Sequence, residues 1–260
     1  MSRSGTLRIA LKEIVSFLDG YLDTGGTPDY PGALNGLQVA GPERVGRFAV
    51  AVDARESVIE AVGGWADLLI VHHGLFWGGL RPLTGPRYRR VKALIDGKTA
   101  LYSAHLPLDS HPEAGNAVIL ARKLRLSSLE PFGDYRGAYV GWRGRVDSPR
   151  RALGDFTARL SEVLGRDVTT IPGGPAILES AAVVTGAGAS TLEEAAEAGV
   201  DVLVTGEAQH HHAIDAAELG VTVLLGGHYE TETFGVRRIA EILTDRFGIE
   251  GRFVDSPTGF

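Results

Sequence analysis

The sequence contains no cysteine among its 260 residues. Disulfide bonds and thiolate metal sites are therefore excluded, so any metal ion must be held by histidine, aspartate or glutamate. These ligands suit zinc, manganese, iron or similar divalent ions, and they do not choose among them.

A basic excess is also lacking, since 26 lysines and arginines stand against 32 aspartates and glutamates, for a net charge of -6. Nucleic acids are bound by clustered basic residues, so we expect no dedicated nucleic-acid surface. No apolar run approaches the roughly 20 residues that span a bilayer, and the first residues lack the apolar core of a signal peptide. We therefore expect a cytoplasmic protein that does not contact a membrane.

What the sequence does contain is a short apolar run, Asp67-Leu-Leu-Ile-Val, that stops at His72 and His73. Such a run is typical of a buried strand in a parallel sheet, and ligands bind outside the carboxyl ends of such strands. Adjacent strand residues point to opposite faces, so both histidines reach one place only if the chain leaves the strand at Gly74 or if two metal ions lie side by side. The alternative is that one histidine caps the sheet and the other is solvated.

Hydrophobic periodicity predicts further elements on both sides of this run. The predicted helices are Thr6 to Leu22, Ser57 to Trp65, Arg150 to Leu164 and Leu192 to Ala198, and the predicted strands are Phe48 to Val52, Ala138 to Val146 and Val168 to Thr170.

The order strand, helix, strand occurs twice in the chain. When Asp201-Val-Leu-Val is aligned with Asp67-Leu-Leu-Ile, Val183 aligns with Ala49 without a gap. Further along, the first copy carries an insertion near Gly78 to Arg90. Chance similarity between α/β segments is the alternative to an internal repeat.

Both copies end in a histidine four residues before a carboxylate, as His105 to Asp109 and as His228 to Glu232. We predict an α/β fold with two similar α/β lobes, related by a pseudo-twofold, and a metal site between them. The predicted first lobe is 1–130, the connecting segment is 131–180 and the second lobe is 181–260, and together they form one compact unit.

Metal-binding side chains gather at the predicted strand ends. The candidates are His72, His73, His105, Asp109, His228 and Glu232, with Asp53, Glu207, His210, His211 and His212 nearby in the sequence. If His228 lies just before a helix, Glu232 can turn back toward the same ion because residues i and i+4 share a face, whereas Glu230 would point elsewhere. Asp109 or Glu232 could bridge two ions. Taken singly, Asp109 could instead be a helix cap and Glu232 a solvated residue.

Five motifs together resemble the dinuclear-metal-centre hexameric proteins of the NGG-interacting factor family, whose bacterial members are called GTP cyclohydrolase type 2 homologues. The motifs are Asn35-Gly-Leu-Gln38, Asp67 to Gly74, Ala104 to Asp109, Thr205-Gly-Glu207 and Gly227 to Glu232, and the resemblance runs from about Leu11 to Phe253. It implies a toroidal homohexamer and metal ligands at His72, His73, Asp109, His228 and Glu232, with Glu232 bridging two ions. The chain departs from many members in reading His-His-Gly instead of His-His-Pro and in its closing residues, Asp255 to Phe260.

The resemblance implies a metal-dependent hydrolase that opens the guanine ring of GTP and releases formate. Glu207 or His105 could then act as the general acid or base. The chain has no phosphate loop, so a triphosphate would be bound by basic residues such as Arg81, Arg87, Arg89 and Arg90. Two alternatives remain: a two-metal phosphoesterase acting on nucleotides, and a metal-binding scaffold or metal-trafficking protein without turnover. In the enzymatic readings the partner is a small-molecule substrate such as a nucleotide.

Overall fold

The computed structural model describes residues 7–147 and 151–260, and the chain divides into two compact units. Unit 1 comprises the described residues up to Leu108 together with Val236–Ser256. Unit 2 comprises the described residues from Asp109 to Gly235 together with Pro257–Phe260. In the part of the chain that the structure describes, no helix is long and apolar enough to cross a membrane.

Unit 1 is built on a five-stranded sheet with the strand order β13-β4-β5-β6-β2. The first four of these strands are parallel, and β2 is antiparallel to β6. The elements are β1 (Ile9–Ala10), α1 (Leu11–Leu22), β2 (Gly36–Val39), β3 (Arg44–Val45), β4 (Arg47–Asp53), α2 (Glu56–Val62), β5 (Leu68–His73), α3 (Gly85–Asp96), β6 (Ala100–Ser103), most of α10 (Thr233–Phe247) and β13 (Glu250–Phe253). A short helix, α4 (Leu106–Asp109), follows β6.

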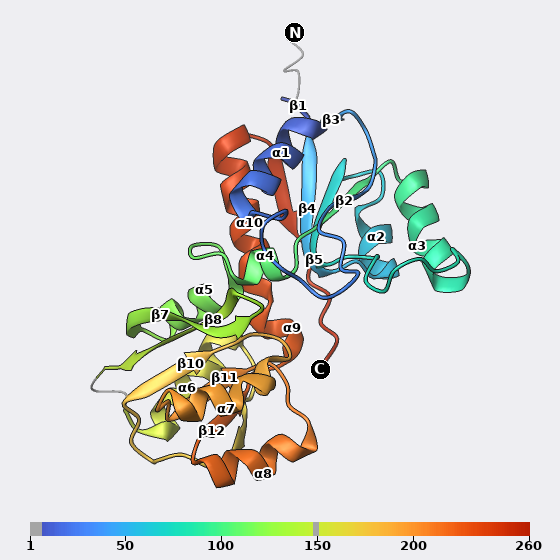
Figure 1. Ribbon diagram of the computed structural model, residues 1–260. Coiled ribbons are helices and arrows are strands. Elements are labelled where there is room, and N and C mark those ends of the chain that lie inside the picture. The colour runs from blue at the N-terminus through green and yellow to red at the C-terminus, as the bar shows by residue number, and fades with distance from the viewer. Residues whose placement is uncertain (1–6, 148–150) are drawn as a thin grey trace. The chain divides into compact units, whose positions relative to one another are not determined.

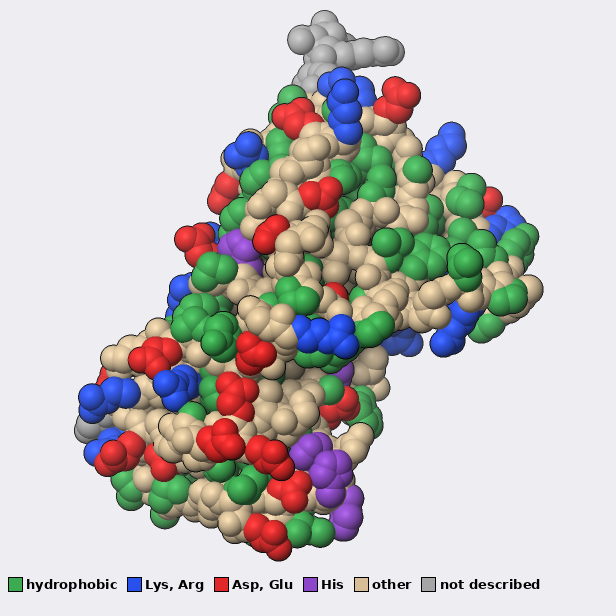
Figure 2. All heavy atoms as spheres, viewed as in Figure 1, with side chains coloured by type: hydrophobic (Ala, Val, Ile, Leu, Met, Phe, Trp, Pro, Cys, Tyr) green, Lys and Arg blue, Asp and Glu red, His purple; other side chains and the backbone are tan. Residues whose placement is uncertain are grey.

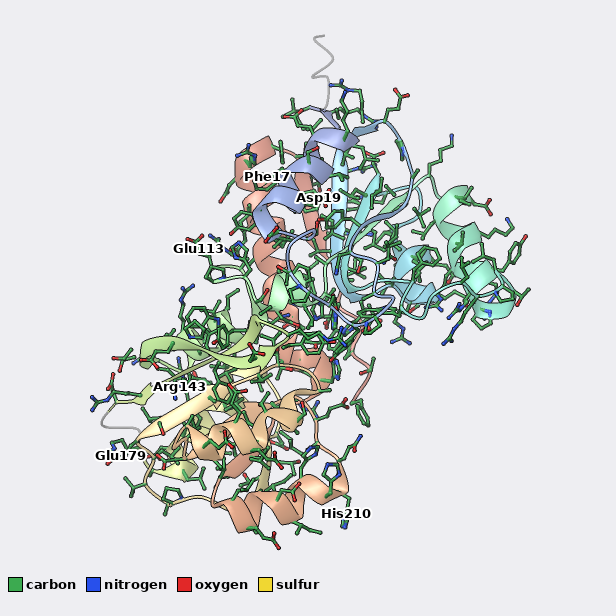
Figure 3. All side chains as sticks on the ribbon, viewed as in Figure 1. Phe17, Asp19, Glu113, Arg143, Glu179 and His210 are labelled. Carbon is green, nitrogen blue, oxygen red and sulfur yellow. The ribbon has the colours of Figure 1, made fainter. Side chains whose placement is uncertain are left out.

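Helices cover both faces of this sheet, with α1 and α10 on one side and α2 and α3 on the other (Figure 1). On the first side, the hydroxyl of the buried Tyr102 on β6 donates to Asp19 Oδ1 on α1 at 2.8 Å, and Figure 3 labels Asp19 there. The second side is an apolar core that includes Val58, Ile59, Val62, Leu69, Val71, Leu94 and Leu101. The parallel strands are thus buried on both faces, as their continuous apolar sequences predict.

Unit 2 is built on a six-stranded sheet with the order β7-β8-β10-β11-β12-β9, in which β10, β11 and β12 are parallel. The elements are α5 (Asn116–Lys123), β7 (Leu126–Tyr135), β8 (Ala138–Val146), α6 (Leu153–Leu164), β9 (Thr169–Ile171), β10 (Ser180–Val183), η1 (Gly188–Thr191), α7 (Leu192–Glu197), β11 (Val202–Thr205), α8 (His210–Leu219), β12 (Thr222–Leu225) and α9 (His228–Thr231). One apolar core packs α5 and α6 against one face of the sheet, and a second packs α7 and α8 against the opposite face. Alternate residues of β10 and β11 belong to different cores, so this sheet also is covered on both faces.

Most predicted elements occur close to their predicted bounds. The strand predicted over Ala138 to Val146 is confirmed as β8. Helix α1 begins at Leu11 and α6 at Leu153, whereas the predicted starts, Thr6 and Arg150, lie outside the described residues. The long strand β7 was not expected from its sequence, because proline and glycine interrupt the alternation that marks a strand.

The two units divide the chain differently from the predicted lobes 1–130 and 181–260. Strand β13, close to the C-terminus, pairs in parallel with β4 and therefore belongs to unit 1. The segment predicted as a connection, 131–180, supplies β8 and β9 to the sheet of unit 2. Pairing between strands that are distant in sequence decides the division, and local periodicity carries no information about such pairing.

Both units contain the predicted order of three parallel strands connected by helices. Leu69 on β5 pairs with Ala49 on β4, and Leu203 on β11 pairs with Ala182 on β10. When Leu69 is placed over Leu203, Ala49 therefore corresponds to Ala182, whereas the sequence comparison places it over Val183. The third strands are displaced by one residue in the same way. The hydrogen-bond register therefore shifts the alignment by one residue in the strand on each side of the central strand. The pseudo-twofold stays a prediction.

Candidate metal centre

Three histidines of unit 1 lie together at the carboxyl end of its parallel sheet. His72 and His73 are the last two residues of β5, and His105 follows the neighbouring strand β6. The ring of His72 lies 4.6 Å from that of His73 and 5.0 Å from that of His105, measured between centroids. One nitrogen from each ring lies within 4.8 Å of the other two, so the group could hold a metal ion.

Each of these rings uses its Nδ1 for a hydrogen bond inside unit 1. The acceptors are Ala104 O for His72 at 3.0 Å, Asp53 Oδ1 for His73 at 2.9 Å and Asp29 Oδ1 for His105 at 2.8 Å. Carbonyl and carboxylate oxygens only accept, so Nδ1 carries a proton, and Nε2 of the neutral ring presents its lone pair. Histidines that bind metals are held in this way, with the second nitrogen donating to a carboxylate or a carbonyl.

The glycine after the histidine pair leaves room for Gln38. A Cβ at position 74 would collide with the Gln38 side-chain amide. That amide donates to Leu34 O at 2.6 Å and accepts from Leu75 N at 2.7 Å, so it joins two loops beside His73. The Gln38 amide thus occupies the space beside Gly74 that a larger residue at this position would need.

In unit 2, His228 lies between two carboxylates. Its Nε2 is 3.2 Å from Glu232 Oε2, and its Nδ1 is 3.2 Å from Glu207 Oε1. Burial alone would lower the pKa of His228, but hydrogen bonds and charge from Glu232 and Glu207 together raise it to about 9. The ring therefore has one carboxylate on its Nδ1 side and a buried carboxylate on its Nε2 side.

The prediction that Glu232 and not Glu230 turns toward His228 is confirmed. His228 begins the short helix α9, and Glu232 follows its last residue. Glu230 points to another partner, because its Oε2 accepts from Arg166 Nη1 at 2.7 Å. The spacing i, i+4 accounts for the difference, as expected for residues on one helical face.

The remaining predicted ligand, Asp109, is buried in unit 2 at the start of a hydrogen-bond chain. Asp109 Oδ1 accepts from Asn116 Nδ2 at 2.8 Å, and Asn116 Oδ1 accepts from Gly235 N at 2.7 Å. The amide fixes the orientation of the carboxylate. A helix-cap role does not explain a side chain that is 5% exposed and bonded to another buried side chain.

Gly186 packs directly against the Glu232 carboxylate and offers a test of this arrangement. It has φ +63, and a Cβ there would collide with Glu232 Oε1 and lie 3.2 Å from His228 Nε2. We expect Gly186→Ala to weaken metal binding at least about 10-fold, because the carboxylate must move. Gly199→Ala is the matched control, since Gly199 has φ +67 with no atom near its Cβ position. Metal titration should separate the two variants; equal affinities would show that the Gly186 contact does not set the position of Glu232.

The histidine run after Glu207 forms a separate surface feature. His210 and His211 are exposed at the start of α8, where histidines gather on the surface, and Figure 3 labels His210 (Figures 2 and 3). His212 Nδ1 accepts from Gln209 N at 3.0 Å and so caps the helix. This contact gives His212 a structural role.

The arginines proposed for triphosphate binding are partly engaged inside unit 1. Arg89 forms an ion pair with Glu56 at 2.7 Å, and Arg90 Nη1 donates to Ala54 O at 3.4 Å. These contacts connect α3 to the α2 region. The other two arginines of the insertion are Arg81, which precedes α3, and Arg87, which lies in its first turn.

Comparison with known proteins identifies the family. Residues 9–258 match the family described as Duf34/NIF3 (NGG1p interacting factor 3). The chain belongs to this family. A Duf34/NIF3 relative from Deinococcus radiodurans, named GTP cyclohydrolase 1 type 2 homolog, is 43% identical over 260 residues, covering 99% of this chain and 97% of the relative. A relative of the same name from Halobacterium salinarum is 48% identical over 231 residues, covering 87% and 91%.

Solved structures agree with this membership and confirm the α/β fold. The protein TTHA1606 from Thermus thermophilus has a TM-score of 0.88 at 39% identity and covers 97% of this chain and 100% of its own. The Duf34/NIF3 resemblance predicted from five motifs is thereby confirmed. In this chain, the described side chains of the family motifs include a histidine group that could hold a metal ion.

Proposed function

We propose that the protein is a metal-dependent hydrolase that holds two divalent ions. The proposed ligands are His72 and His73 from unit 1 and Asp109, His228 and Glu232 from unit 2, with Glu232 bridging both ions. The observation that carries the proposal is that His72 and His73 each have Nδ1 held by an acceptor and each offer a nitrogen within 4.8 Å of the other and of a nitrogen of His105, which places a third, non-ligand imidazole beside the proposed ions.

The donor set fits zinc, manganese or iron, since it consists of imidazoles and carboxylates without a thiolate. When bound, two such ions would act as Lewis acids and lower the pKa of a bound water toward neutrality. The chain supplies the orientation: Ala104 and Asp53 fix the rings of His72 and His73, and Glu207 holds His228 from its Nδ1 side. We therefore assign Glu207 to positioning His228.

The proposed reaction is hydrolytic opening of the guanine ring of GTP, with release of formate. The name of the relatives, GTP cyclohydrolase 1 type 2 homolog, supports this substrate. C8 is bonded to N7 by a double bond and to N9 by a single bond, so formate release consumes two waters, and N7 takes up two protons while N9 takes up one. A proton-transfer group is therefore needed beside the ions, and we propose His105 for this role. The homohexamer implied by the resemblance stays a prediction.

The test is to load the purified protein with zinc, manganese or iron and to measure formate released from GTP and phosphate released from nucleotides. We expect formate release, and we expect His228→Asn to abolish it together with most metal binding. Phosphate release without formate would instead favour a two-metal phosphoesterase. Bound metal with neither product would favour a metal-binding scaffold or trafficking protein.

A further inference from the structure

His105 is a buried histidine whose ring is fixed from several sides. It is 7% exposed, and its ring lies 4.5 Å from that of Trp77, nearly perpendicular to it, and 5.2 Å from that of Tyr30. Trp77 is itself fixed, since its Nε1 donates to Gly74 O at 2.7 Å. These rings restrict rotation of the imidazole about its side-chain bonds.

The partner of His105 is Asp29, a carboxylate that is held by further donors. Asp29 Oδ1 accepts from His105 Nδ1 at 2.8 Å and from Tyr30 N at 2.6 Å. Asp29 Oδ2 accepts from Asn35 Nδ2 at 2.8 Å and from Leu106 N at 3.2 Å. Burial raises the pKa of Asp29, but the bonds from His105, Asn35 and Tyr30 hold it below its ordinary value, so the carboxylate is ionised near neutral pH.

Asn35 connects the two ends of this arrangement. Its Nδ2 donates to Asp29, and its Oδ1 accepts from the His105 backbone N at 2.8 Å. Thus the loop that carries Asp29 and the chain that leaves β6 are fixed to each other beside the imidazole. The side chains of Asp29 and His105 are 6% and 9% exposed, so solvent does not compete strongly for the bond between them.

This geometry fixes which nitrogen of His105 can react. Because Nδ1 carries the proton that it donates in the hydrogen bond to Asp29, Nε2 of the neutral ring presents its lone pair, and in unit 1 one nitrogen of the ring lies within 4.8 Å of ligand atoms of His72 and His73. We propose that Asp29 is the positioning residue of a proton-transfer pair with His105. The inference deepens the proposed function and rests on it.

The proton movements balance around the ring. Nε2 takes a proton from the attacking water while the water oxygen bonds to carbon and the π electron pair of that carbon moves onto its doubly bonded nitrogen or oxygen. The ring then carries both protons beside ionised Asp29. Nε2 next gives its proton to the nitrogen that leaves as the carbon–nitrogen bond breaks, which restores the starting tautomer. Asp29 keeps its hydrogen bond throughout and takes no proton, as in other carboxylate–histidine pairs.

The experiment compares Asp29→Asn with Asp67→Asn in the full-length, metal-loaded protein. Asp67 is a suitable control because it is another carboxylate of unit 1 that accepts from backbone amides, those of Gly46 and Arg47, at 2.7 and 3.2 Å. For each variant we would measure bound metal, kcat and KM for formate release, and the nitrogen chemical shifts of the His105 ring by NMR.

We expect Asp29→Asn to keep its metal and its KM but to lose about 100-fold or more in kcat, since the amide can favour the wrong tautomer. The His105 nitrogen shifts should change in this variant and stay unchanged in Asp67→Asn. An equal loss of kcat in the two variants would overturn the inference. A wild-type His105 ring whose neutral form carries its proton on Nε2 would also overturn the inference. This measurement needs neither a stable variant nor turnover. Absence of formate release from wild-type protein would count against the proposed function alone, because the ring tautomer is still measured.

Discussion

Glu232→Ala protein, purified without chelator, should carry at most about one metal ion per chain, whereas Glu230→Ala protein should carry about two. The reason lies in the different contacts of the two carboxylates. Glu232 is 3% exposed and faces His228 Nε2, while Glu230 forms an ion pair with Arg166. If Glu232 bridges two ions as proposed, its loss removes a ligand from both, whereas loss of a partly exposed ion pair changes stability by only about 0–1 kcal/mol.

Elemental analysis of the two variants and the wild type, side by side, decides this prediction. Thermal unfolding should accompany it, because a folded Glu232→Ala protein is needed for the comparison. Reconstitution with excess metal should restore Glu230→Ala fully and Glu232→Ala only in part. If both variants bound as much metal as the wild type, neither carboxylate would be a ligand and the bridging assignment would have to be withdrawn.

The parts of the fold that follow from local pattern could be predicted from the sequence. The apolar run before His72 is β5, and the alternating segment from Ala138 to Val146 is β8. The return of β13 to pair with β4 could not be predicted in this way, since it depends on which distant strand offers a free edge. The division into units therefore required the structure.

The candidate ligands were accessible to sequence reasoning because their spacing has a physical meaning. A histidine and a carboxylate at i and i+4 share a helical face, which singles out Glu232 over Glu230. The groups that orient the ligands carry no such signal. Asp29 lies in an irregular stretch 76 residues before His105, and only the folded chain brings the two together. Asp53 is different, since it ends the strand that pairs with β5, and that position could have indicated contact with His73.

Metal binding should release close to one proton from His228 at pH 8, a higher pH than an ordinary histidine would allow. In the metal-free protein, Glu232 and Glu207 raise the pKa of His228 to about 9 against the effect of burial. The ring is therefore protonated at pH 8 and must lose that proton to bind a metal ion through nitrogen. Because the pKa of His228 is raised on folding, its protonation stabilises the metal-free folded state. This stabilisation is fully present below about pH 6.5, the ordinary histidine pKa, and is lost as pH rises through about 9.

The same competition sets how metal affinity depends on pH. Below pH 9 the affinity should fall about tenfold for each unit because of His228 alone, and more steeply near pH 6.5, where ordinary histidines also take up protons. Calorimetry in buffers of different ionisation enthalpy measures the released proton. Glu207→Gln should move the release to lower pH, since it removes one of the two carboxylates that raise the His228 pKa, and His228→Asn should abolish it. Equal proton release at pH 8 from the wild type and His228→Asn would show that another group supplies the proton, and His228 would then not be a ligand whose proton the metal must displace.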